Sequence, residues 1–432
     1  MGEINGDCRR EFRRATNKSD FGGGPAIKRS LAGSLASRLS TDWTMKTKEH
    51  SMHVRFELMI SLAFCAFASR APAADAEKLA APPKLTFAQA EPLAEMNARF
   101  EPKEGWIGGD GAYSVAMSPR RTLWLFSDTW VGNVQDGKRT NATIVNNTVG
   151  VQEGTDPTSK LNFFVAKDAK QKPAALITPA DGKGWFWLQA GVPVKDRLVL
   201  FLSQIEKSGD GGALGFKQIG RTLGSVANPL EEPTKWRVEQ HKLVPEIMNR
   251  ERELTFGSAI LTDGDFVYLY GTDERRQPGV FNERFLIVAR VPLAEVEDQK
   301  AWRFFHAGEW VADFEQADHL CGGMATEFSV SYLPAFKQYA LVTTENGLSD
   351  KIMVRTGANP WGPWSEPTTV YRCPEMASDK KIFCYAAKAH PSQAAGDELV
   401  ISYVANSFDF WQVAKDARLY WPRFVRVKVS AK

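Results

Sequence analysis

Two aspartates stand at opposite ends of the stretch "GGDGAYSVAMSPRRTLWLFSDTW", residues 108–130. If this stretch folds into a hairpin that turns near Pro119, both acids lie at the same end, with Asp128 opposite Ala112 and Asp110 one step further out. Opposite and diagonal pairs in a sheet place the two carboxyl groups about 5 to 9 Å apart. This range covers both separations used to cleave glycosidic bonds, about 5 to 5.5 Å and about 6.5 to 9.5 Å.

The aspartates have both a chemical and a structural interpretation. Two clustered carboxylates push their pKa values apart, so that one can hold a proton while the other is ionised. The glycines around Asp110 would let a ligand approach the backbone closely. Alternatively, Asp110 caps its own turn and Asp128 pairs with an arginine such as Arg139.

Further candidates stand near the starts or ends of strand-like runs. Glu327 follows a glycine pair much as Asp110 does, which makes it a third candidate catalytic acid. Amide and acid side chains would bind sugar hydroxyls, and aromatic faces would stack on sugar rings. The candidates for substrate binding are Trp185, Trp187, Asn147, Gln204 and Glu253. Each also has a structural alternative, because tryptophans pack in cores and most acids are simply solvated.

One hairpin pattern recurs five times along the chain. Its apolar second strands are predicted at residues 122–130, 197–205, 266–274, 338–346 and 398–406, each after a turn and another strand-like run. A third strand follows in each unit and a fourth in most, and residues 85–93 would supply the strand missing from the last unit. This predicts an all-β five-bladed β-propeller with four antiparallel strands per blade. The alternative is a chance alignment of amphipathic strands in another all-β fold.

The other four units show that the fold does not require the acid pair. Gln204, Thr272, Thr344 and Val404 occupy the position that corresponds to Asp128. In a propeller, the first residues of the innermost strands line the central funnel. The sequence therefore predicts a paired-aspartate site in that funnel.

The first unit, "GGDGAYSV…TLWLFSDTW" followed by "NATIVNNTVGV", resembles a known family. It is similar to secreted five-bladed β-propellers of the domain of unknown function 4185 type, which are related to endo-D-arabinanase glycoside hydrolases. The resemblance runs from about Trp106 to the C-terminus and is strongest in this unit. It implies glycoside hydrolase activity, with Asp110 and Asp128 as the catalytic pair, and leaves the sugar open.

The N-terminal part predicts export. Residues 52–76 have the short basic start, apolar centre and small-residue exit of a signal peptide. Residues 1–51 are polar and patternless, which indicates a disordered or mis-called extension. The expected product is a secreted or periplasmic propeller domain of residues 77–432, in which Cys373 and Cys384 form a disulfide.

Composition narrows the partners. A net charge of +3 in 432 residues gives no basis for nucleic-acid binding. Six histidines without a His/Cys cluster predict no metal site, and no cofactor is expected. We expect a monomer that acts on a carbohydrate. Two rival functions remain open, a carbohydrate-binding propeller without catalysis and a protein-interaction scaffold.

Overall fold

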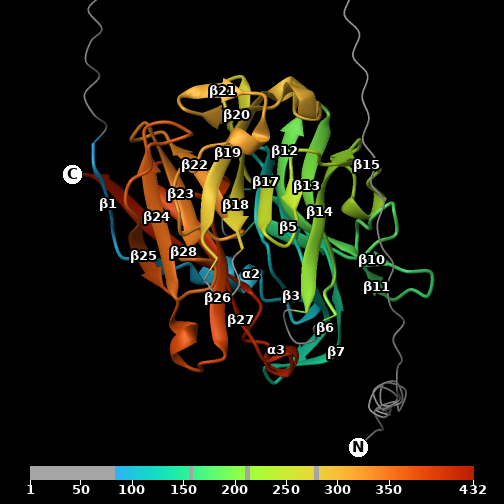
Figure 1. The fold of residues 1–432 in the computed structure, drawn as a ribbon. Coiled ribbons are helices and arrows are strands. Elements are labelled where there is room, and N and C mark those ends of the chain that lie inside the picture. Colours follow the sequence, from blue (N-terminus) through green and yellow to red (C-terminus); the bar gives the residue numbers. More distant parts are fainter. Residues whose placement is uncertain (1–82, 155–158, 210–214, 277–281) are drawn as a thin grey trace, which may run out of the picture. The chain divides into compact units, whose positions relative to one another are not determined.

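The computed structural model describes residues 83–154, 159–209, 215–276 and 282–432 (Figure 1). The predicted extension and signal peptide lie outside these residues. Ala76–Lys432 form one compact unit, which is all-β apart from short helices such as α2 (Ala94–Arg99) and α3 (Phe410–Lys415). Among the described residues, no helix is long and apolar enough to cross a membrane.

Five antiparallel sheets contain most of the strands. Sheet 1 is β4 (Tyr113–Ser118), β5 (Arg121–Phe126), β8 (Thr148–Glu153) and β9 (Lys160–Phe164). Sheet 2 is β12 (Trp185–Val194), β13 (Arg197–Lys207), β14 (Phe216–Val226) and β15 (Val238–Lys242). Sheet 3 is β16 (Ile247–Met248), β17 (Arg252–Asp263), β18 (Phe266–Arg275), β19 (Arg284–Pro292), β20 (Arg303–His306) and β21 (Glu309–Val311).

Two further sheets complete this set. Sheet 4 is β22 (Phe328–Leu333), β23 (Gln338–Thr344), β24 (Lys351–Gly357) and β25 (Thr368–Arg372). Sheet 5 is β26 (Ile382–Ala389), β27 (Glu398–Ser407), β28 (Pro422–Ala431) and β1 (Leu85–Phe87), with β2 (Glu91–Pro92) also on β28. The antiparallel pairing of β1 with β28 confirms the predicted role of the N-terminal strand. Sheet 3 has six strands rather than the predicted four.

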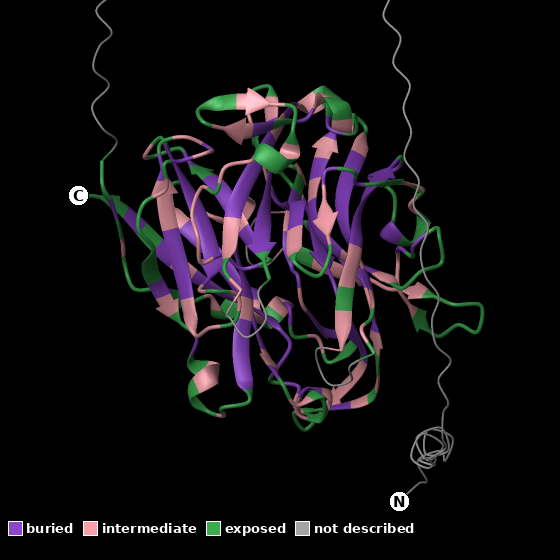
Figure 2. Ribbon diagram, viewed as in Figure 1, coloured by how far each residue is buried: buried purple, intermediate pink, exposed green. Residues whose placement is uncertain are grey.

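Apolar clusters join each of the five sheets to two others. Sheet 1 packs on sheet 2 through residues such as Leu123 and Leu188, and on sheet 5 through residues such as Trp124. Similar clusters join sheets 2 and 3, 3 and 4, and 4 and 5. Because both faces of each sheet are covered, the second strands are continuous apolar runs without polar alternation. Figure 2 shows the resulting buried strands and the exposed loops between them.

The first hairpin is longer than predicted and divides between two sheets. β3 (Glu104–Gly109), β6 (Thr129–Gln135) and β7 (Lys138–Val145) form a separate three-stranded sheet, the insert sheet. The runs "TLWLFSDTW" and "ATIVNNTVGV" therefore each split between two strands, with breaks at residues 127–128 and 146–147. A small sheet of β10 (Ala166–Lys167) and β11 (Pro173–Ala174) lies outside the five.

The predicted disulfide is not formed in the structure. Cys373 and Cys384 are free, buried thiols. They lie close enough for a hydrogen bond between them, which together with burial raises the pKa of Cys373 above its ordinary value. A protonated thiol does not attack another sulfur, because the thiolate is the nucleophile. The predicted proximity is therefore correct, and the predicted bond is not.

Candidate active site

The two aspartates face one another directly across the first hairpin. Gly109 pairs with Thr129 on one side of them and Tyr113 with Leu125 on the other. Between these pairs, the backbone N–H of Asp110 donates to the carbonyl of Asp128 at 3.2 Å. The predicted pairing of Asp128 with Ala112 is therefore wrong. Gly111 and Ala112 have φ values of +77° and +51° and leave the regular strand, which shifts the register.

The acid pair opens into a cavity of about 630 Å³, called here the acid cavity. The side chains at the starts of several first strands line it. The predicted site residues among them are Asp110, Asp128, Glu327, Trp187 and Glu253. Five sequence positions separated by up to 217 residues thus share one cavity, because each stands near the start of the first strand of its sheet or on the adjoining hairpin.

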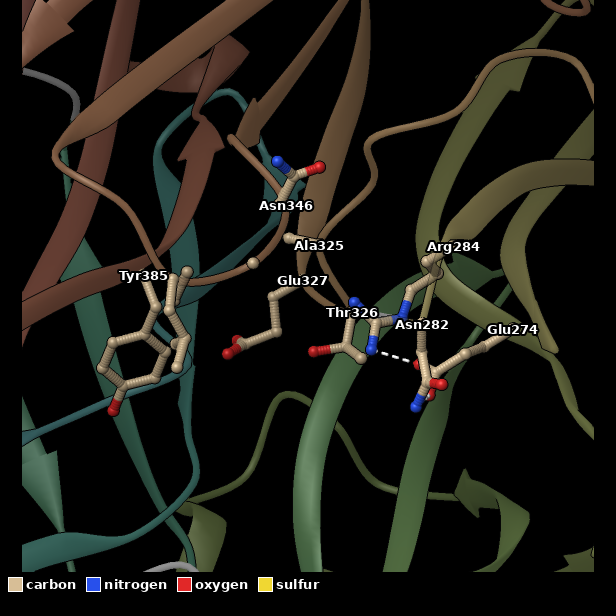
Figure 3. Close-up of a pocket in the computed structure, with 11 residues that line it drawn as sticks. Glu274, Asn282, Arg284, Ala325, Thr326, Glu327, Asn346 and Tyr385 are labelled. Carbon is tan, nitrogen blue, oxygen red and sulfur yellow. Dashed lines mark hydrogen bonds and ion pairs between the residues drawn. The ribbon is translucent and has the colours of Figure 1, made fainter. Parts of the chain in front are cut away.

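A second hollow of about 490 Å³ adjoins the acid cavity, and Glu327 lines both. Figure 3 shows Glu327 and Tyr385 on one side of it, and Glu274 with Arg284 on the other. Arg284 forms an ion pair with Glu274, and Arg276 pairs with both Glu274 and Glu253. The wall formed by sheet 3 is therefore ionic, with its acids already paired.

Asp110 is placed to hold a proton. Its Oδ2 accepts hydrogen bonds from the hydroxyls of Tyr385 at 2.6 Å and Tyr420 at 2.8 Å. Its buried Oδ1 has no hydrogen-bond partner within the described part of the chain. Burial, followed by the negative charges of Asp128 and Glu327, raises the pKa of Asp110 to about 8, against a smaller opposing effect of the tyrosines. A proton on Oδ1 would leave Oδ2 as the acceptor of both hydroxyls.

Asp128 is held by neutral donors. Its Oδ1 accepts from the indole N–H of Trp187 at 2.9 Å and from the side-chain amide of Asn146 at 3.0 Å. Burial raises the pKa of Asp128 to about 6, and these two hydrogen bonds limit the rise. The two aspartates therefore differ by about two pKa units, which is the separation expected of an acid and a base that share one site.

Glu327 is paired with a buried cation. Lys388, only 2% exposed, donates to Glu327 at 3.0 Å and lies 4.3 Å from the ring centre of Tyr113. Burial lowers the pKa of Lys388, and the charge of Glu327 opposes this effect. An ammonium group with a carboxylate partner in a low-dielectric site favours the charged form of both groups. Glu327 is therefore suited to be a permanent negative charge beside Asp110.

Three predicted site residues do not line the acid cavity. Asn147 is fully buried and bonds the backbones of Ile177 and Phe186, so it fastens a loop to sheet 2. Gln204 donates to Asp181 and to the carbonyl of Lys183. Trp185 is half-buried, two residues before Trp187. These predictions of substrate contact are corrected, because register alone does not say which neighbours already satisfy a polar side chain.

The glycines near Asp110 make room for the protein itself. A Cβ atom on Gly108 would lie 2.6 Å from the carbonyl oxygen of Tyr420 and 3.0 Å from Arg139. The predicted close approach of a ligand is thus replaced by the approach of the segment before β28. Arg139 does not pair with Asp128 either. Its guanidinium donates to backbone carbonyls, including those of Val413 and Leu419.

Sequence reasoning missed the residues that orient the acids. Tyr385 lies in "CYAAK" at the start of β26, where the repeat could have marked it as the fifth-unit counterpart of a funnel residue. Tyr420 lies outside every repeated strand, and its sequence carries no signal. Asn146 adjoins the predicted Asn147, and the break between β7 and β8 decides which of the two faces the cavity. Within the described residues, no group of three or more His, Cys, Asp or Glu side chains is arranged to hold a metal ion.

Fold and site together define an all-β protein with three carboxylic acids in one cavity between its sheets. The chain belongs to the family described as Domain of unknown function (DUF5005), which matches residues 94–429. The match is to a different domain from the 4185 type, and the endo-D-arabinanase relationship is not confirmed. No curated protein matches the chain.

Solved structures share the fold. A candidate hydrolase from Bacteroides ovatus superposes with a TM-score of 0.62 at 17% identity, over 79% of this chain and 93% of that one. A thermostable family-43 glycoside hydrolase has a TM-score of 0.40 at 14% identity, covering 76% and 91%. The GH43_1 enzyme from Xanthomonas citri complexed with xylotriose has a TM-score of 0.40 at 12% identity, covering 78% and 91%. At these identities the likeness concerns the fold and no more.

Proposed function

We propose that the protein is a secreted glycoside hydrolase that cleaves a poly- or oligosaccharide in the acid cavity. The observation that carries this proposal is the acid pair itself. Two carboxyl groups face each other across one hairpin, open into one cavity, and have pKa values of about 8 and about 6. Glycosidic bond cleavage needs one protonated and one ionised carboxyl group on either side of the bond.

The environments assign a role to each aspartate. Asp110, as the neutral acid, donates its proton to the glycosidic oxygen as the bond to the leaving sugar breaks. Asp128, as the carboxylate, either removes a proton from water or attacks the anomeric carbon, and its Oδ2 is free of the two donors that hold Oδ1. Trp187 and Asn146 act as positioning residues, because they hold the carboxylate rather than the substrate.

Glu327 supports the protonated state of Asp110. Its negative charge raises the pKa of Asp110, and its ion pair with Lys388 favours the ionised carboxylate. We therefore assign Glu327 an electrostatic role in place of the predicted one as a catalytic acid. Glu253, paired with Arg276, belongs to the ionic wall.

We propose that the five sheets form the blades of one propeller and that the acid cavity is its funnel. Support comes from the five clusters that join each sheet to two others, and from a pocket lined by all five first strands. We also propose export through the signal peptide at residues 52–76. N-terminal sequencing of the mature protein from the producing cell should then begin shortly after Ala73 or Ala76.

A glycan screen tests the proposal. The purified protein is incubated with a panel of polysaccharides and chromogenic glycosides, and new reducing ends or released chromophore are measured. Asp128→Asn, with the same side-chain shape, is the control for contaminating activities. Hydrolysis by the wild type that the variant lacks supports the proposal. Equal hydrolysis by both proteins, or binding of a glycan without any cleavage, contradicts it and favours a carbohydrate-binding role.

A further inference from the structure

An exposed aromatic group borders the acid cavity. Seven large hydrophobic side chains are exposed in the described part of the chain, and three of them occur within four consecutive residues. These are Phe408, Phe410 and Trp411, which are 49%, 44% and 69% exposed. We call them the aromatic platform. Phe410 begins α3 and also lines the acid cavity, so the platform continues the cavity wall outward.

Ring contacts connect the platform to the acid pair. Phe408 packs on Phe383 with ring centres 4.5 Å apart, and Phe383 packs on Tyr385 at 5.6 Å. Tyr385 is the residue whose hydroxyl binds Asp110. Phe410 contacts Trp411 at 5.6 Å in an edge-on arrangement. A continuous line of rings therefore leads from Asp110 to the protein surface.

The platform is held in place by its polar neighbours. Asp409 caps α3 through the backbone N–H groups of Trp411 and Gln412, and its other oxygen binds Lys381 at 3.0 Å. On the far side of α3, Arg139 donates to the carbonyl of Val413. Figure 1 shows α3 beside β7, the strand that carries Arg139. Aromatic side chains fixed in advance lose little conformational freedom when a ligand binds.

The two sides of the acid cavity differ in a way that indicates one ligand class. The side formed by sheet 3 is ionic, with its acids paired to Arg276 and Arg284. The side formed by sheet 5 and α3 is aromatic. Sugar rings have polar edges and faces rich in C–H groups, and these faces pack on exposed aromatic rings. A chain of sugars entering the cavity from α3 would meet rings first and carboxyl groups last.

We infer that the aromatic platform binds the sugar units of a polysaccharide chain that lie outside the acid cavity, so that the substrate is a polymer rather than a short glycoside. The inference rests on the proposed function and extends it. It identifies Trp411 and Phe408 as residues that bind the polymer without contacting the bond that is cleaved.

A binding assay tests this inference separately from catalysis. Asp128→Asn protein is run on native gels that contain each polysaccharide of the panel, and its retardation gives an affinity. Adding Trp411→Ala or Phe408→Ala should weaken retention about tenfold, since a lost aromatic contact corresponds to about 1.4 kcal/mol. Leu230→Ala is the matched control, because Leu230 is 68% exposed and lies outside the platform and the cavity lining.

Each outcome decides a different question. Retention that falls with the platform variants, together with cleavage by the wild type, supports both proposals. The same loss of retention without any cleavage supports the platform and overturns the hydrolase. Unchanged retention in Trp411→Ala and Phe408→Ala, or no retention by any polysaccharide, overturns the platform. Trp411-dependent binding to phospholipid vesicles, or Trp411-dependent dimerisation in the absence of sugar, would also overturn it.

Discussion

The first strands of the five sheets line two hollows with opposite chemistry. Residues at their starts line the acid cavity, of about 630 Å³, and residues further along line a second pocket of about 480 Å³, called here the far pocket. On β12, for example, Trp187 belongs to the first and Val192 to the second. The same strands thus produce two spaces of similar size.

Their linings differ almost completely. The acid cavity contains Asp110, Asp128 and Glu327, whereas no aspartate or glutamate is among the described residues that line the far pocket. The buried His390 of the far pocket lies between two serine hydroxyls, and burial lowers its pKa to about 3, so it is neutral. Sheet packing therefore creates both hollows, and only the residues at the strand starts make one of them chemically active.

The largest expected effect separates the two hollows by catalysis. Asp110→Asn or Asp128→Asn should lower turnover by about 10²- to 10⁴-fold, because each removes proton transfer or nucleophilic assistance. Steady-state kinetics on the glycoside found by screening measures it. Turnover near that of the wild type in either variant would remove that aspartate from the mechanism and erase the contrast between the hollows.

The pH profile sharpens the assignment of the acid pair. Activity requires Asp128 ionised and Asp110 protonated, so it should be bell-shaped with limbs near pH 6 and pH 8. Beyond each limb the rate falls about tenfold per pH unit. The two values belong to the coupled pair. Residual activity of Asp110→Asn should lack the alkaline limb. A wild-type profile that stays flat from pH 7 to pH 9 would contradict the role of Asp110.

Stability should depend on pH through the same group. Because folding raises the pKa of Asp110 from 3.8 to about 8, the unfolded chain binds fewer protons between these values. The free energy of unfolding of the wild type therefore falls as pH rises from about 4 to about 8, by at most about 1.4 kcal/mol per pH unit from this group. Asp110→Asn should lack this decrease. Denaturant unfolding of both proteins at several pH values measures the difference, and parallel curves would argue against a raised pKa.

The smallest effect is expected in the far pocket. Ser331 is 2% exposed, and its hydroxyl has no hydrogen-bond partner in the described part of the chain. Ser331→Ala removes a buried polar group that is already unsatisfied, so stability should stay the same or rise by less than about 1 kcal/mol. Turnover should not change. A clear loss of turnover would show that the far pocket takes part in function after all.

Much of the architecture follows from the sequence alone. The hairpin repeat placed nearly every strand of the five sheets, because strands covered on both faces must be apolar runs separated by turns. The pairing of β1 with β28 followed from counting the strands of the last unit. Asp110, Asp128, Trp187, Glu253 and Glu327 were found because each stands near the start of a first strand or on its hairpin partner.

The tertiary structure decided what surrounds these residues. The extra strand β3, the break at Gly111 and the shift that brings Asp128 opposite Asp110 depend on the segment that ends in Tyr420, which no repeat predicts. The partners that separate the two pKa values come from other sheets, as does the Lys388 that pairs with Glu327. A sequence shows which side chains reach the end of a strand. Burial and neighbouring charge, which set the pKa of a carboxyl group, exist only after the sheets have packed.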